Sequence, residues 1–203
     1  TLYLRPNYFL GGYCMPEVWY DQYADELNFL RKLGCIGVMI DGPSLMWATR
    51  GLDTYVMGRL CATPDAKPES LVSEYCEAFG PAAREIGDYF EHWRKYLLEH
   101  TEAINKIYES SSRKWYFHGF HYAAYAHRIF PADELKKGRP FLERAAALTR
   151  GTADAAKVDF LRRGLEYAIA SSECAAIFDG RENTVEQKRQ AWDELKKMRA
   201  TLP

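Results

Sequence analysis

Residues 35–41 read "CIGVMID", an apolar run that stops abruptly at Asp41. A short continuous apolar run is typical of a strand that is buried on both faces, as in a parallel sheet. A second strand-like stretch, "LYLRPNYF", occupies residues 2–9. Between the two stretches, apolar residues recur at helical intervals over residues 20–33, and Gly34 is well placed as the C-terminal cap. The pattern predicts a β-α-β unit with parallel strands.

Two parallel strands need further partners, because both faces and both edges of such a small sheet require cover. After Asp41 the sequence offers no further convincing strand. Either the chain is the tail of a larger α/β domain, or its strands pair with something outside it. We favour the tail.

The sequence after Arg50 has helical spacing throughout. One pattern stops before Pro64, the next begins at Pro68, and the longest runs from Ile86 to Ile107 with intervals that alternate between four and three. Further signals are a break at Gly138 and Pro140, a helix over residues 158–172, and a capping box of Thr184 with Gln187. We therefore predict a mainly α fold in which a helical bundle follows the β-α-β element.

The composition is that of a soluble globular protein, with 203 residues of which 47% are hydrophobic and 27% charged. A net charge of −1 gives no electrostatic signature of nucleic-acid or anionic-membrane binding. No apolar run approaches the ~18 residues of a membrane span. The five cysteines are widely spaced without a C-x-x-C pair, so we expect mostly buried free thiols rather than disulfides or a zinc site. We predict no metal and no cofactor.

Several stretches share the pattern of a known family. "WATRGLDTYVMGRL" at residues 47–60 places Trp-Ala before a Gly-Leu-x-x-Tyr-Val helix, and "EYCEAFGPAA" at residues 74–83 carries Tyr-Cys and Phe-Gly-Pro-Ala-Ala. Later helices read "FPADELKKGRPFLERAAAL" (130–148) and "KVDFLRRGLEYAIASSE" (157–173). Together they resemble the domain of unknown function 4838, a family found in large bacterial proteins related to glycoside hydrolases.

The resemblance implies a (β/α)₈ barrel followed by a helical domain. Residues 1–62 then correspond to the last two barrel units and residues 63–203 to the helical bundle. The six preceding strands are absent from this sequence. Glycans, and the rest of a longer polypeptide or a second subunit, are the implied partners, and a periplasmic or secreted location is the implied compartment.

In such a barrel the ligand site forms at the C-terminal ends of the strands. Arg5 and Asn7 lie near the end of the first strand-like stretch, Asp41 ends the second, and Trp47 could stack on a sugar ring. These four residues are our predicted substrate-binding residues, and Asp41 is also the catalytic candidate. The alternative is structural: Asp41 caps the loop, Arg5 pairs with it, and Trp47 packs against the helix.

Glycoside hydrolysis commonly requires two carboxyl groups. Asp41 is the one carboxylate that the sequence places convincingly at a strand end, while Asp53 sits inside a helical pattern and Glu17 and Asp21 lie in or near the connecting loop. We therefore expect the chain alone to be catalytically incomplete.

Two functions follow from these patterns. The first is a module of a carbohydrate-active protein that supports and partly lines a sugar cleft. The second is a structural or protein-interaction domain, in which the aromatic segment "WYFHGFHYAAYAHRIF" (115–130) binds a neighbour. An open concave surface shared by Trp47 and Asp41 would favour the first, and burial of both under the bundle would favour the second.

Overall fold

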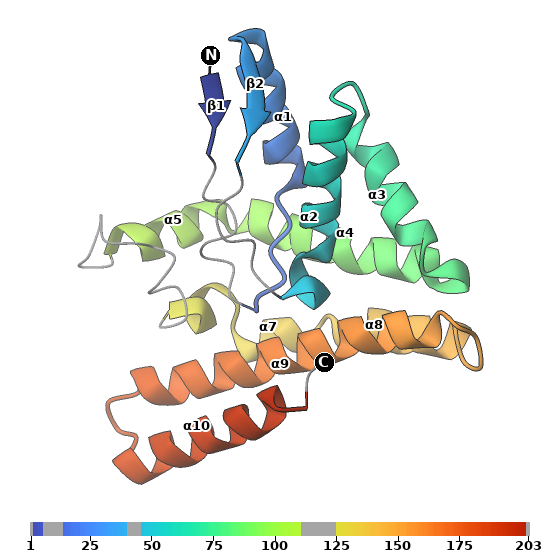
Figure 1. Cartoon of the computed structure of the whole chain (residues 1–203). Helices are drawn as coiled ribbons and strands as arrows, with labels where there is room; N and C mark the ends of the chain where they lie inside the picture. Colours follow the sequence, from blue (N-terminus) through green and yellow to red (C-terminus); the bar gives the residue numbers. More distant parts are fainter. Residues whose placement is uncertain (1, 6–13, 40–45, 111–124, 202–203) are drawn as a thin grey trace.

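The computed structural model describes residues 2–5, 14–39, 46–110 and 125–201, which form a mainly helical molecule with a two-stranded sheet at one end (Figure 1). The elements are β1 (Leu2–Leu4), α1 (Tyr20–Lys32), β2 (Cys35–Val38), α2 (Trp47–Ala62), α3 (Pro68–Glu77), η1 (Gly80–Ala82), α4 (Ala83–Glu99), α5 (Thr101–Ser110), α7 (Ala132–Lys136), α8 (Arg139–Leu148), α9 (Ala155–Asp179) and α10 (Val185–Arg199).

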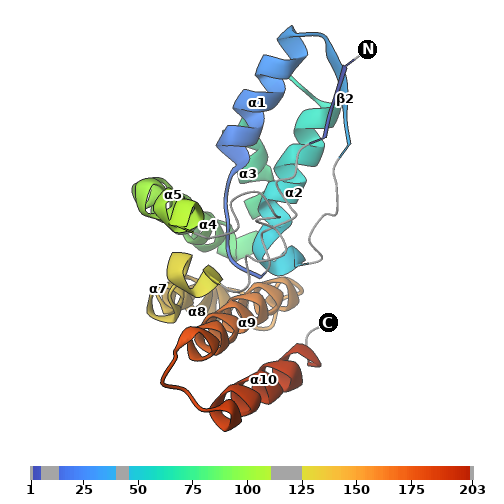
Figure 2. The same ribbon diagram turned by 90° about the vertical axis from the view of Figure 1, so that its left-hand side faces the viewer.

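The predicted β-α-β unit is confirmed. β1 and β2 pair in parallel, with Leu2 opposite Cys35, and the Met39 amide extends the ladder by donating to the Leu4 carbonyl at 2.8 Å. α1 ends at Lys32, and Gly34, two residues later, has a φ of +84°, a left-handed conformation that glycine adopts without strain. α1 lies against one face of the sheet, and in the described part of the chain the other face is open (Figure 2).

The helical bundle is organised around two helices. α2 contacts α1, α3 and α9, and α9 contacts α7, α8 and α10 as well. α10 lies on the side of α9 that faces away from the sheet (Figures 1 and 2). One buried apolar cluster runs from Cys14 to Leu195 and includes residues on both sides of residue 62. The predicted division into residues 1–62 and 63–203 stays a prediction.

Local helix signals were largely correct. α3 begins at Pro68, the break between α7 and α8 falls before Arg139, and Thr184 forms the capping box with Gln187, whose amide donates to the threonine hydroxyl at 3.2 Å. The continuous helix predicted from Ile86 to Ile107 was wrong, because α4 ends at Glu99 and α5 begins at Thr101. The Thr101 hydroxyl bonds the Leu97 carbonyl at 2.9 Å, and this type of side-chain bond competes with the helical ladder.

The start of α2 is held directly against α9. A Cβ atom at Gly164 of α9 would lie 2.3 Å from the Cβ of Ala48, so the two helices approach as closely as a glycine allows. The contact fixes the first turn of α2, which carries Trp47, beside the preceding turn of α9, which carries Phe160.

Two further sequence predictions concern cysteines and membranes. All five cysteines are free, and Cys14, Cys76 and Cys174 are buried, as expected for most of them. Cys61 is exposed. Within the described ranges, none of the helices combines the length and apolarity needed to cross a membrane.

Candidate functional site

The structure describes two of the four predicted substrate-binding residues. Trp47 opens α2 and remains 51% exposed, so it is not buried under the bundle. Arg5 directly follows β1 and is exposed. Asn7 and Asp41 lie outside the described residues, and their predicted roles, including catalysis by Asp41, stay predictions.

Trp47 lines an open groove with a volume of about 450 Å³. One face of α2 contributes most of the lining, Tyr75 of α3 and Phe160 of α9 complete it, and four of the eight lining residues are aromatic. The lining residues are Trp47, Gly51, Thr54, Tyr55, Gly58, Arg59, Tyr75 and Phe160.

Two glycines of α2 leave room for the groove because they have no side chains. A Cβ atom at Gly58 would meet no heavy atom within 4 Å, so its backbone faces open space. A Cβ atom at Gly51 would lie 2.7 Å from the Tyr75 hydroxyl oxygen, so this glycine allows the tyrosine to lie over α2. Glycine within a helix costs roughly 0.5–1 kcal/mol relative to alanine. α2 tolerates both because its opposite face is buried in the core through Leu52, Val56 and Leu60.

The core holds the aromatic side of the groove in place. The ring centroid of Tyr75 lies 5.5 Å from that of Tyr55 and 5.8 Å from that of the buried Phe90, which it meets edge-on. Burial raises the pKa of Tyr75 well above its ordinary value, so its hydroxyl is neutral at physiological pH. The groove therefore presents a fixed aromatic ring with a neutral hydroxyl.

One end of the groove is polar. Arg59 Nη1 donates to the Tyr55 hydroxyl oxygen at 2.8 Å and also pairs with the Glu74 carboxylate of α3. Hydrogen bonds from Tyr55 and from Arg59 lower the pKa of Glu74. Glu74 and Arg59 are both ionised at neutral pH, and their charges cancel.

The opposite face of α2 carries a buried ionic cluster that the sequence did not reveal. Arg50 pairs with Glu17, and the Asp53 carboxylate accepts the Trp19 amide at 3.0 and 3.2 Å. All three charged side chains are buried. The available signal in the sequence was the spacing of Arg50 and Asp53, two charged residues three positions apart in an apolar helical pattern. Their partners could not be predicted, because Glu17 and Trp19 lie more than thirty residues earlier in the chain. The cluster ties residues 14–19 to α2.

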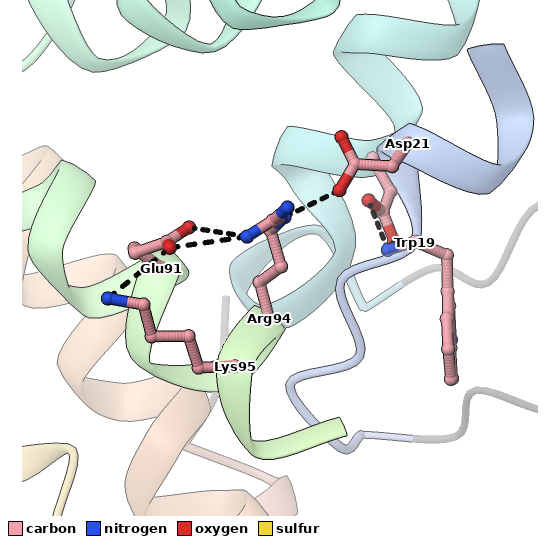
Figure 3. Close-up of polar contacts among 6 residues, drawn as sticks. Trp19, Asp21, Glu91, Arg94 and Lys95 are labelled. Carbon is pink, nitrogen blue, oxygen red and sulfur yellow. Dashed lines mark hydrogen bonds and ion pairs between the residues drawn. The ribbon is translucent and has the colours of Figure 1, made fainter. Parts of the chain in front are cut away.

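The carboxylates considered as catalytic partners of Asp41 have structural contacts. Glu17 and Asp53 belong to the buried cluster. Asp21 pairs with Arg94 of α4 at 2.5 Å, and Arg94 also contacts Glu91, which in turn pairs with Lys95 (Figure 3). Among the described residues that line the groove, none is a carboxylic acid.

The aromatic segment of residues 115–130 is only partly described, because residues 115–124 lie outside the described ranges. Tyr125, Ile129 and Phe130 are buried, and the Ile129 carbonyl accepts the Tyr96 hydroxyl at 2.5 Å. Ser172 donates to the Phe130 carbonyl at 2.7 Å. The described end of the segment packs in the core.

Comparisons with known proteins add no relative. Neither the protein-family models, nor the curated proteins, nor the solved structures give a match to this chain.

Proposed function

We propose that this chain is the C-terminal module of a carbohydrate-active, glycoside-hydrolase-like protein, and that it binds a sugar chain without hydrolysing it on its own. The observation that carries the proposal is the open groove in which exposed Trp47 lies beside further aromatic rings and a polar end. The sugar-binding function calls for Trp47 and Asp41 to share an open concave surface. Trp47 lies on such a surface, and Asp41 lies outside the described residues.

The chemistry of the groove suits a sugar. A pyranose ring has apolar C–H faces that pack on aromatic rings and hydroxyl groups at its rim that need donors and acceptors. The groove supplies aromatic surface from Trp47, Tyr55 and Tyr75 and polar atoms from Arg59 and Thr54. Its volume of about 450 Å³ lies within the range usual for small-molecule sites.

Binding without hydrolysis follows from the carboxylates. Glycosidases place two carboxyl groups about 5–5.5 Å or roughly 6.5–9.5 Å apart around the scissile bond. The described lining of the groove offers no such pair. Turnover of any glycoside by this chain that is abolished by Asp41→Asn would contradict this part of the proposal.

Affinity electrophoresis in gels containing soluble β-glucan, xylan or mannan tests the proposal. We expect at least one glycan to retard the chain, and Trp47→Ala to weaken that retardation by about tenfold or more in affinity, as for loss of a stacked aromatic ring. Trp192→Ala is the matched control, because Trp192 is similarly exposed, at 47%, but belongs to α10 and does not line the groove.

A second variant separates binding from folding. Gly58→Leu places a side chain into open space in the groove and replaces glycine by a better helix former, so the fold should be at least as stable. We expect its retardation to be lost while its thermal midpoint is kept. Retardation unchanged by both Trp47→Ala and Gly58→Leu would overturn the groove as the binding site.

The sheet supports the further proposal that the chain joins a longer polypeptide or a second subunit. Parallel sheets are normally covered on both faces, yet Tyr3, Ile36 and Met39 are all more than half exposed. In this proposal the remaining strands of a barrel cover the sheet. The same observation favours the alternative function of an interaction module, which does not require a sugar.

A further inference from the structure

We infer that the Arg59–Glu74–Tyr55 group at the end of the groove selects neutral glycans with adjacent hydroxyl groups over glycans that carry carboxylates. The inference rests on the proposed sugar-binding function of the groove and adds the class of sugar.

The group is a preformed arrangement rather than a chance surface pair. Arg59 lies over the Tyr55 ring, with its guanidinium carbon 5.7 Å from the ring centroid, and it contacts both the Tyr55 hydroxyl and Glu74 through Nη1. Tyr55 and Arg59 are one helical turn apart in α2, and Glu74 reaches them from α3. Two helices that pack together therefore hold the donor and the acceptor in a fixed relation.

The charges decide which ligand fits. Arg59 is the one charged residue among the described lining of the groove, and Glu74 already neutralises it. A sugar carboxylate would approach Glu74 as a like charge, or would have to displace Glu74 from Arg59. In both cases the binding free energy of the charged sugar becomes less favourable, whereas a neutral sugar meets neither penalty.

A pair of adjacent hydroxyls matches the group instead. One hydroxyl can donate to Glu74, which is an acceptor only, while its neighbour accepts from the Arg59 guanidinium, which is a donor only. Arg59 contacts Tyr55 and Glu74 through Nη1, and its guanidinium carries five N–H donors in total. Both side chains are partly exposed, so a sugar at the open groove can reach them.

The test uses the same gels with polygalacturonate as an additional glycan. For the wild-type chain we expect the affinity for the best neutral glycan to exceed that for polygalacturonate by about tenfold or more. Glu74→Gln removes the negative charge but keeps the shape, so it should weaken binding of the neutral glycan by about tenfold and narrow or reverse the preference. Glu77→Gln is the matched control, because Glu77 is an exposed carboxylate of the same helix that accepts a hydrogen bond from Ser73 and not from Arg59.

The outcomes separate the two proposals. The selectivity would be overturned if the chain preferred polygalacturonate, or if Glu74→Gln left the preference for the neutral glycan unchanged. In either case, binding that still depends on Trp47 would leave the sugar-binding groove supported. Absence of retardation by every glycan would overturn the sugar-binding function together with the selectivity.

Discussion

Asp53 and Arg50 lie one helical turn apart on the buried face of α2, and with Glu17 they place two carboxyl groups beside one guanidinium. Burial is the main cause that raises the pKa of Asp53 to about 7; Arg50 and the Trp19 amide oppose the shift, and the nearby charges of Glu17 and Asp21 contribute to it. The cluster thus favours a protonated Asp53 over much of the acidic range.

The sign of the pH effect follows from this shift. Between about pH 4 and pH 7 the folded chain keeps a proton on Asp53 that the unfolded chain has already lost. Unfolding therefore releases a proton, and the contribution of Asp53 to stability falls as the pH rises through this window, then stays constant above it.

Asp53→Asn should remove this dependence while its amide oxygen still accepts the Trp19 amide. We expect the free energy of unfolding of the variant, relative to wild type, to rise by on the order of 2 kcal/mol between pH 5 and pH 8. Urea unfolding at both values measures the difference, and Asp25→Asn at an exposed position of α1 is the control. A relative stability that does not change with pH would contradict the buried, protonated state of Asp53.

α2 illustrates how one element serves two purposes. Its buried face carries Leu52, Val56 and Leu60 into the core, and its other face contributes most of the lining of the groove. Its position depends on the close approach of Ala48 to Gly164 in α9. The geometry of the groove is therefore a property of helix packing, not of α2 alone.

Gly164→Ala should disturb that packing, because its methyl group would lie 2.3 Å from the Ala48 Cβ and must push the helices apart. We expect a loss of about 1–3 kcal/mol in the free energy of unfolding, despite the better helix propensity of alanine. Gly87→Ala in α4 is the matched control, since its methyl group would meet only the Cys76 sulfur at an ordinary 3.8 Å. Equal free energies of unfolding of the two variants in urea would contradict a destabilising clash between α2 and α9.

At the scale of the whole molecule, the bundle buries its large apolar side chains better than the sheet does. Trp93 is fully enclosed in the bundle, whereas Ile36 and Met39 at the sheet are 67% and 57% exposed. The exposed apolar side chains of the sheet favour the proposal that the rest of a longer polypeptide or a second subunit covers it.

Ile36→Lys should therefore impair association more than folding. We expect the chain to self-associate in sedimentation velocity at micromolar concentration, and the variant to stay monomeric with its free energy of unfolding changed by about 0.5 kcal/mol or less, as for an exposed site. Val185→Lys is the control, because Val185 is an equally exposed apolar residue at the start of α10. A monomeric wild-type chain, or equal effects of the two variants, would contradict self-association through the sheet.

The sequence by itself determined the features that depend on neighbours within a few residues. The β-α-β order, the glycine that follows α1, the break before Arg139 and the capping box at Thr184 all follow from local hydrogen bonding and side-chain periodicity. The break at His100 was not predicted, because the helical spacing of apolar residues continues without interruption across it. The hydrogen bond of the Thr101 hydroxyl to the Leu97 carbonyl leaves no trace in that spacing.

Only the tertiary structure decided where the candidate site lies. Trp47 was predicted to stack on a sugar ring, but the groove that surrounds it needs Tyr75 of α3 and Phe160 of α9 to be brought against α2. The pairing of Arg50 with Glu17 likewise joins residues 33 positions apart. Such contacts depend on how whole helices pack, because no periodicity within a segment specifies which distant side chain will fill the space beside it.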